Sequence, residues 1–240
     1  AWKATGAGRG YSSLAAAKGR LYTLGLRGER EFVVAFDQKT GKEVWATAYG
    51  NAFRNDRGDG PRGTPTVDGD RVYSLGGGGD LSAVDAKTGK LIWQMNVLQK
   101  FGGSNITWGI SESPLVIGEK LLVNAGGPGA SIVALNKKDG SLIWKSQSDR
   151  AGYSSGIPVT LNGKTQVVFF THSRGLGLDL VHEDEGGAVG GHLRLVVARG
   201  RPPALHRISV LDVREQVPVE REAPPPQQVF VAAPGGAAPS

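Results

Sequence analysis

The sequence offers few side chains that could do chemistry, and the strongest candidates are two acidic residues in one loop. The stretch RNDRGDG at 54–60 contains Asp56 and Asp59, and closely spaced carboxylates are typical of calcium loops. A calcium loop needs more oxygen ligands at alternate positions, and no Asp-x-Asp-x-Asp-Gly run is present. We therefore interpret 54–60 as a solvated loop between strands and predict no metal site.

Serines, glycine-rich stretches and histidines do not form a catalytic motif either. The serines that follow Tyr11 and Tyr153 have no histidine nearby, so nucleophilic catalysis is not expected. GGGG at 76–79 and GAGRG at 6–10 lack the Lys-Ser/Thr pair of a phosphate loop and are interpreted as turns. The spacing of the four histidines matches no metal motif. No catalytic or cofactor-binding residue is predicted.

Composition excludes several classes of function. With no cysteine among 240 residues, the chain has no disulfide, no thiolate metal site and no cysteine nucleophile. No apolar run approaches the ~20 residues of a transmembrane helix, and the first residues lack the apolar core of a signal peptide. The net charge is +6, but the basic residues are scattered among turns without a clustered run. No nucleic-acid partner is therefore predicted.

One phrase occurs three times and defines the architecture that must position any site. DQKTGKEVW ends at Trp45, DAKTGKLIW ends at Trp93 and NKKDGSLIW ends at Trp144. Matching stretches precede the phrases, with RLYTLG at 20–25, RVYSLG at 71–76 and KLLVNAG at 120–126. The period of about 47 residues is typical of the blades of a β-propeller.

Within each unit the hydrophobic period is two, which predicts short β-strands. No helical segment separates the strands, so antiparallel four-stranded blades are expected rather than a parallel sheet. The 37 glycines supply the many turns that such a fold needs. We predict an all-β fold, an open β-propeller fragment of about three to four blades, over residues 1–180.

The repeated phrase has a structural explanation. Its TG or DG pair closes a tight hairpin, and the glycine supplies a positive φ. The residue that opens the phrase accepts backbone N–H bonds at the turn, and the tryptophan packs one blade against the next. The structural residues predicted in this way are Asp37, Gly41, Trp45, Asp85, Gly89, Trp93, Asn136, Gly140 and Trp144.

The phrase resembles the blade signature A-x-D-x-x-T-G-K-x-x-W of the bacterial PQQ-binding-like β-propeller repeat family. Residues 83–93 match it at every fixed position, whereas the copy that ends at Trp144 keeps only its glycine and tryptophan. The resemblance covers residues 1 to about 180. The family includes quinone-dependent alcohol dehydrogenases and also non-enzymatic propellers, such as the lipoprotein of the outer-membrane barrel assembly machinery.

This resemblance leaves two functions open. A quinoprotein dehydrogenase would need PQQ, a Ca²⁺ site, a catalytic Asp and often a Cys pair, and cysteine is absent. About three blades also fall short of the roughly 4 to 8 that surround a propeller axis. We therefore favour a non-catalytic binding scaffold that needs no cofactor. A fragment of a PQQ- and Ca²⁺-dependent alcohol dehydrogenase is the alternative.

The favoured interpretation implies a protein partner, or the remainder of a larger propeller, as the binding partner. The family resemblance implies a periplasmic or cell-envelope location. The candidate contact residues are three aromatic side chains: Tyr11 and Tyr153, which occupy matching positions in GRGYSS at 8–13 and RAGYSS at 150–155, and Trp108. Core packing is the alternative for Trp108, which interrupts the spacing of the other tryptophans.

The pattern breaks inside the fourth unit. GIPVTLNGKTQVVFFT at 156–171 and GLGLDL at 175–180 begin this unit, but no TGK phrase with a tryptophan follows near residue 187. Residues 172–240 contain no Lys, Thr, Asn, Tyr, Trp or Met, and they hold all four histidines: His172, His182, His192 and His206. We interpret 181–240 as an aberrant or disordered Gly/Ala/Arg/Pro-rich tail produced by a shifted reading frame. A genuine Pro/Ala-rich tail is the alternative.

Overall fold

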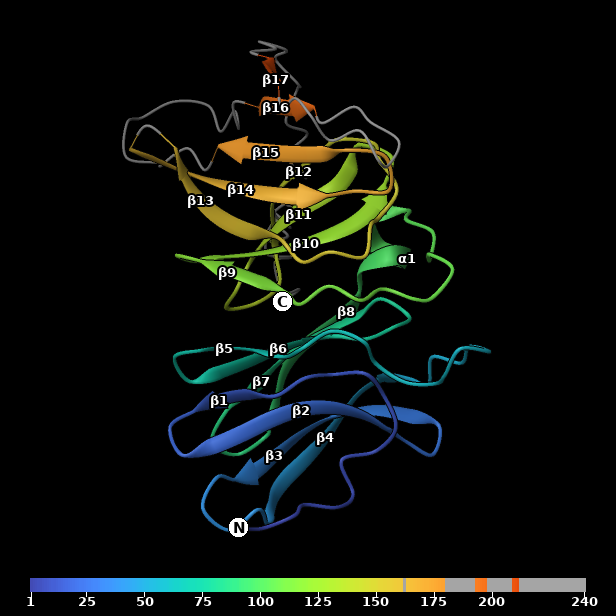
Figure 1. The fold of residues 1–240 in the computed structure, drawn as a ribbon, viewed down its shortest axis with the longest axis vertical. Helices are drawn as coiled ribbons and strands as arrows, with labels where there is room; N and C mark the ends of the chain where they lie inside the picture. The colour runs from blue at the N-terminus through green and yellow to red at the C-terminus, as the bar shows by residue number, and fades with distance from the viewer. Residues whose placement is uncertain (162, 180–192, 198–208, 212–240) are drawn as a thin grey trace, which may run out of the picture.

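The computed structural model describes residues 1–161, 163–179, 193–197 and 209–211, and these residues form mostly β-strands (Figure 1). The strands make four antiparallel sheets, in which neighbours along the chain are also hydrogen-bonded neighbours. Three sheets have four strands, as the repeat predicts, and the last has five. The prediction of an open all-β propeller fragment is confirmed.

Each repeat unit corresponds to one sheet, which we call a blade. The first blade is β1 (Ala15–Ala17), β2 (Arg20–Arg27), β3 (Arg30–Asp37) and β4 (Glu43–Asn51). The second is β5 (Thr66–Asp68), β6 (Arg71–Leu75), β7 (Asp80–Asp85) and β8 (Leu91–Asn96), followed by the short helix α1 (Val97–Phe101). The third is β9 (Leu115–Ile117), β10 (Lys120–Gly127), β11 (Ala130–Asn136) and β12 (Leu142–Ser146). The fourth is β13 (Ile157–Leu161), β14 (Lys164–Phe170), β15 (Gly175–Asp179), β16 (Leu193–Val197) and β17 (Ser209–Leu211).

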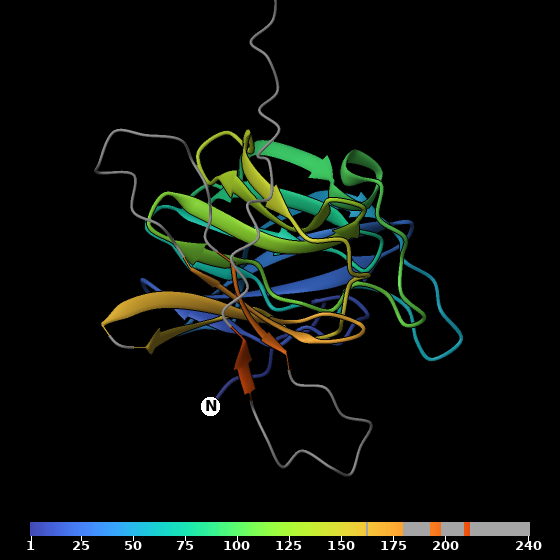
Figure 2. The same ribbon diagram turned by 90° about the horizontal axis from the view of Figure 1, so that it is seen from above.

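The apolar cores lie between successive blades. Side chains alternate across a strand, so each middle blade sends one set toward each neighbour. Tyr22 and Val33 of the first blade pack against Val72 and Val84 of the second. The second and third blades enclose Tyr73, Leu75, Leu121 and Val123, and the third and fourth enclose Leu122, Ile132, Phe169 and Leu176. The blades are therefore stacked side by side, as Figures 1 and 2 show.

Alternating strand direction places two kinds of connection at opposite ends of the blades. The β1–β2 and β3–β4 turns and their equivalents share one end, which we call the turn face. It consists of residues 18–19, 38–42, 69–70, 86–90, 118–119 and 137–141. The loops between blades share the other end, which we call the loop face, with residues 1–14, 52–65, 97–114 and 147–156. In Figure 1 the turn face lies at the left and the loop face at the right.

The fourth blade contains two strands from the region that the sequence assigns to an irregular tail. β16 pairs with β15 through Gly177 and Leu178, and β17 pairs with β16. The missing Trp phrase gave no indication of these strands, because backbone pairing requires no particular side chain. The position near residue 187 lies outside the described residues, and the shifted reading frame stays a prediction.

Candidate functional site

On the turn face, the residues of the repeated phrase build one type of hairpin three times. Asp37 Oδ1 accepts hydrogen bonds from the backbone N–H and the hydroxyl of Thr40, both at 2.8 Å. Asp85 makes the same contacts with Thr88 at 2.7 and 2.6 Å. These hydrogen bonds, led by the threonine hydroxyl, lower the pKa of both aspartates. In the third copy Asn136 Oδ1 accepts from the backbone N–H of Lys138 at 2.9 Å.

Each turn is also the contact point of the preceding tryptophan. The indole N–H of Trp45 donates to the carbonyl of Ala86 at 3.3 Å, and that of Trp93 donates to the carbonyl of Lys137 at 3.2 Å. Gly41, Gly89 and Gly140 have φ of 69°, 75° and 75°. A Cβ atom at Gly89 would lie 2.6 Å from the Trp45 ring, so this position needs glycine for its backbone and for its neighbour.

The predicted tryptophans are half-buried and lie at successive blade interfaces. Trp45 packs on the core between the first two blades, Trp93 on the next core and Trp144 on the last. Trp2 makes the equivalent contact on the first blade, where its indole donates to the carbonyl of Gln38 at 3.1 Å. The tryptophans therefore join blades, with one face on the core and the edge at the turn.

An arginine and a tyrosine complete this contact, and the sequence analysis did not single them out. Arg20 Nη1 and the Tyr22 hydroxyl donate to the carbonyl of Ala86 at 2.6 and 3.2 Å. Arg71 and Tyr73 make the same bonds to the carbonyl of Lys137, each at 3.0 Å. The shared Arg-x-Tyr of the first two repeats was the available signal.

The loop face holds the three predicted contact residues on three different loops. Tyr11, Trp108 and Tyr153 are 59%, 52% and 43% exposed. The Trp108 and Tyr153 rings lie 5.4 Å apart, and the backbone N–H of Trp108 donates to the Tyr153 hydroxyl at 3.4 Å. Tyr11 donates to the carbonyl of Arg57 on the neighbouring loop. These rings are thus exposed and yet held in fixed positions.

Arg62 connects these loops and is the functional candidate that sequence reasoning missed. Its guanidinium lies 5.4 Å from the Tyr11 ring centre and 4.5 Å from that of Phe53. It donates to the carbonyls of Trp108 and Gly58, both at 2.6 Å. Arg62 lies at the same distance before β6 as Tyr11 does before β2, so the two residues occupy equivalent repeat positions. The replacement of tyrosine by arginine at this position was the sequence signal for its role.

The acidic loop at 54–60 is closed by an ion pair. Arg54 lies 2.8 Å from one oxygen of Asp59 and 2.6 Å from Glu29. The other oxygen of Asp59 accepts the backbone N–H of Asn55 at 3.1 Å. These hydrogen bonds lower the pKa of Asp59, and the bond from the Arg54 side chain has the largest effect. The Asp59 carboxylate therefore already has partners within the loop.

Two glutamates near the loop face are fully buried. Glu31 accepts from the Tyr49 hydroxyl at 3.2 Å, and burial raises its pKa to about 7. Glu112 accepts from the backbone N–H of Asn124 at 2.6 Å, and burial raises its pKa to about 8. A general acid or base must reach the substrate proton, and these carboxyls do not reach the surface. The titration of Glu31 and Glu112 therefore makes the stability of the fold depend on pH.

No three His, Cys, Asp or Glu side chains of the described residues gather in a way that could hold a metal ion. Within the same residues, no helix combines the length and the apolar character of a membrane span. The geometry of the two faces thus consists of structural contacts on the turn face and of exposed, anchored aromatic rings on the loop face.

Comparison with known proteins gives two kinds of relative. The quinoprotein alcohol dehydrogenase PedH of Pseudomonas putida is 30% identical over 148 residues, which cover 59% of this chain and 24% of the relative. The outer membrane protein assembly factor BamB of Yersinia pestis is 32% identical over 146 residues, which cover 60% of this chain and 34% of the relative. The chain thus spans about a quarter to a third of these relatives.

A solved structure and a family description agree with the fold. The structure of a europium-containing methanol dehydrogenase superposes with a TM-score of 0.52 at 21% identity, over 70% of this chain and 39% of that chain. The sequence-family description "Outer membrane protein assembly factor BamB" matches residues 2–188, most of the chain. The chain therefore belongs to this PQQ-like β-propeller family, which the repeated turn phrase indicated.

Proposed function

We propose that the chain is part of a non-catalytic β-propeller scaffold of the bacterial cell envelope that binds a protein through its loop face. The observation that carries this proposal is the group of exposed rings at Tyr11, Trp108 and Tyr153, anchored by Arg62. Tyr, Trp and Arg are the residue types that dominate protein-binding hot spots. Rings that are already fixed lose less conformational entropy on binding.

The relatives named as BamB support this proposal. Their name assigns them to outer membrane protein assembly, which is a protein-binding role in the envelope. The scaffold needs no cofactor of its own. Its partner is a protein or the remainder of a larger propeller.

The alternative is a fragment of a quinoprotein alcohol dehydrogenase. The similarity to PedH and the superposition with a methanol dehydrogenase favour it. Such an enzyme would use PQQ and Ca²⁺. In this chain the buried Glu31 and Glu112 are poorly placed for acid–base work on a substrate, which is why we favour the scaffold.

Photo-cross-linking in the native cells tests the loop face. A cross-linking amino acid at Trp108 should yield a discrete protein adduct, whereas the same amino acid at Lys39, on the turn face, should not. Equal labelling at both positions would contradict a loop-face partner. Dye-linked alcohol oxidation by the full-length protein after addition of PQQ and Ca²⁺ would instead establish the dehydrogenase.

A further inference from the structure

The fold collects basic side chains that are scattered along the sequence. All β1–β2-type and β3–β4-type turns lie at one end, so Lys18, Lys39, Lys42, Lys87 and Lys90 share the turn face. Between the first two blades this face contains a cavity of about 300 Å³. The cavity lies where the β1–β2 turn meets the β5–β6 and β7–β8 turns.

Three cationic side chains and one carboxylate line this cavity. The Lys18 ammonium donates to the carbonyl of Gly69 at 2.7 Å, and Arg20 donates to the carbonyl of Lys87 at 2.6 Å. The ammonium of Lys87 has no ion pair or hydrogen bond within the described part of the chain. The carboxylate is Asp70, whose side chain is 86% exposed. The lining therefore carries a net charge of +2.

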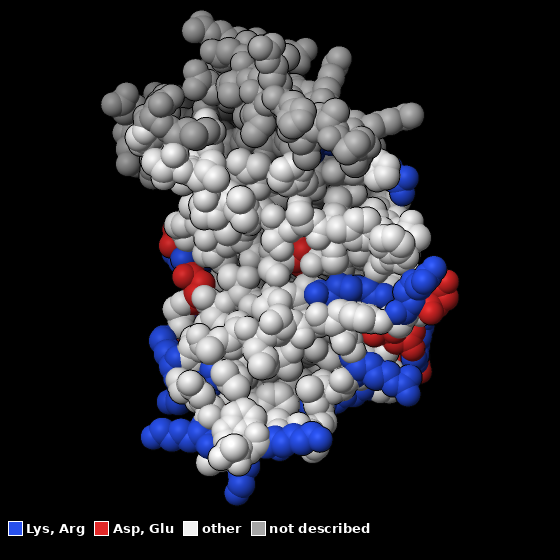
Figure 3. Space-filling view, viewed as in Figure 1, with Lys and Arg blue, Asp and Glu red and all other residues white. Residues whose placement is uncertain are grey.

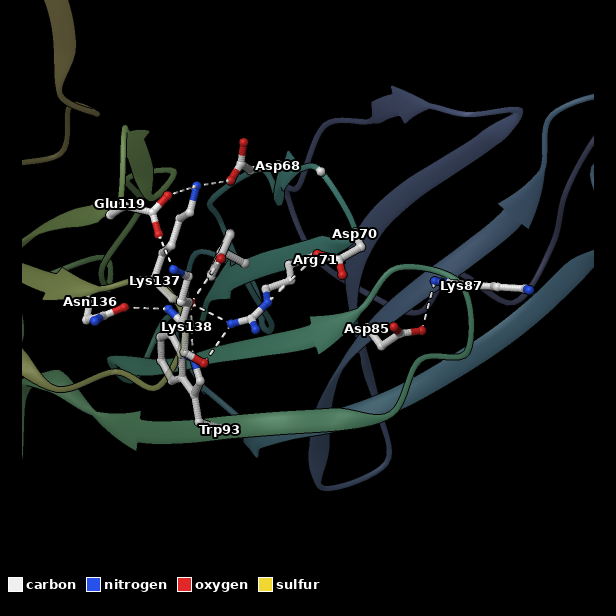
Figure 4. A network of polar contacts seen from close by, with 12 residues as sticks. Asp68, Asp70, Arg71, Asp85, Lys87, Trp93, Glu119, Asn136, Lys137 and Lys138 are labelled. Carbon is white, nitrogen blue, oxygen red and sulfur yellow. Dashed lines mark hydrogen bonds and ion pairs between the residues drawn. The ribbon is translucent and has the colours of Figure 1, made fainter.

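At the equivalent junction between the second and third blades, carboxylates of the chain itself pair with the lysines. Lys137, which occupies the position of Ala86 one blade later, lies 2.9 Å from Asp68 and 3.3 Å from Glu119 (Figure 4). Glu119 also pairs with Lys138, which corresponds to Lys87, at 2.7 Å. This junction thus contains an additional lysine side chain, and two carboxylates pair with its two lysines.

Two substitutions in the repeat leave the first junction open and basic. Ala17 stands where the second blade has Asp68, and Ala86 stands where the third blade has Lys137. The short Ala86 side chain leaves free the space that a lysine occupies one blade later. In Figure 3 basic and acidic side chains lie together about halfway up the left edge, whereas only basic side chains appear lower on that edge.

We propose that the cavity between the first two blades binds a phosphate group. Lys and Arg are the side chains that bind phosphate, and a dianion matches the net charge of the lining. Tyr22 and Ala86 in the lining are buried, and charge interactions are stronger beside such low-dielectric surface. The same chemistry could be offered by free phosphate or by the headgroup of an anionic lipid.

Calorimetric titration of the full chain with inorganic phosphate tests the site. Lys87→Met should weaken binding by about tenfold, because it removes one charge-assisted contact. Within the described residues the Lys87 ammonium makes no hydrogen bond or ion pair, so this variant should stay close to the wild-type melting temperature. Ala17→Asp should weaken binding further, because it introduces the carboxylate that the next junction has at Asp68. The matched control is Lys39→Met, on another turn, which should bind as the wild type does.

Sedimentation with vesicles separates the two sources of phosphate. Retention on phosphatidylglycerol vesicles but not on phosphatidylcholine vesicles, lost in Lys87→Met, would identify a lipid headgroup. Phosphate binding without vesicle retention would identify a soluble phosphate. Absence of both kinds of binding, or equal binding by the wild type, Lys87→Met and Ala17→Asp, would overturn the proposal.

Discussion

The turn face and the loop face are the two ends of the same blades, but they use their residues in opposite ways. On the turn face the same contact recurs, with a tryptophan of one blade on the glycine and the carbonyl of the next turn. On the loop face each connection differs, and Arg62 joins three of them through unlike partners. Repetition thus marks the contacts that hold blades together on the turn face, whereas Arg62 and Trp108 on the loop face depart from the repeat.

The largest expected difference between the faces concerns two tryptophans. Trp93→Ala should lower the free energy of unfolding by about 3–4 kcal/mol, since it removes packing on Tyr73 and Gly140 and a hydrogen bond to Lys137. Trp108→Ala, on the loop face, should cost less than about 1 kcal/mol because half of that side chain is already exposed. Urea denaturation of both variants measures the difference. Equal losses would remove the distinction between the faces.

A second prediction separates backbone strain from inter-blade contact on the turn face. Gly89→Ala should lower the free energy of unfolding by about 2–3 kcal/mol. The alanine would have to adopt a positive φ, and its Cβ would collide with the Trp45 ring. Gly69→Ala is the matched control, since Gly69 has φ of 59° but nothing within 4 Å of its Cβ position. It should cost about 1 kcal/mol, the cost of a left-handed backbone alone. If both variants lose the same stability, the tryptophan contact contributes nothing.

The two faces should also respond to pH in opposite directions. The pKa of Glu112 is raised from 4.5 to about 8, so stability from its protonated form is full below pH 4.5 and is lost as the pH rises toward 8. Glu112→Gln should therefore gain about 2 kcal/mol relative to the wild type between pH 5 and pH 8.5. The pKa of Asp85 is lowered, so its carboxylate stabilises the fold above about pH 4, and this stability is lost as the pH falls further. Asp85→Asn should therefore be less stable than the wild type at neutral pH, and the difference should shrink at low pH. Melting temperatures across this range test both signs, and a gain by Glu112→Gln at pH 5 alone would refute the first.

The turn face could be predicted from the sequence because its contacts are local and repeated. Asp85, Gly89 and Trp93 lie within nine residues of each other, and the turn chemistry of Asp and Gly does not depend on the rest of the fold. The carbonyl to which each tryptophan donates lies on the next blade, so it can be identified only once the stacking of the blades is known.

The loop face and the basic cavity could not be predicted in the same way. Arg62 gains its role from Trp108, which lies on another loop, and from Phe53, which lies nine residues earlier on its own loop, and no local pattern links these residues. The lysines looked scattered along the sequence because consecutive turns are separated by a whole strand pair. Trp108, by contrast, was signalled by its departure from the spacing of the other tryptophans, and Tyr11 and Tyr153 by their shared Gly-Tyr-Ser-Ser sequence.

The smallest expected effect tests whether the loop face is held rigid by Arg62. Arg62→Lys keeps the positive charge but loses the planar fork that donates to Trp108 and Gly58 and stacks on Phe53. The global loss should be about 1 kcal/mol, whereas hydrogen exchange in residues 52–64 and around Trp108 should become clearly faster. Arg57→Lys is a suitable control, because its backbone carbonyl rather than its side chain contacts Tyr11. Unchanged exchange in Arg62→Lys would mean that the aromatic rings are positioned by their own loops, and the loop face would then lose the feature that most distinguishes it from an ordinary surface.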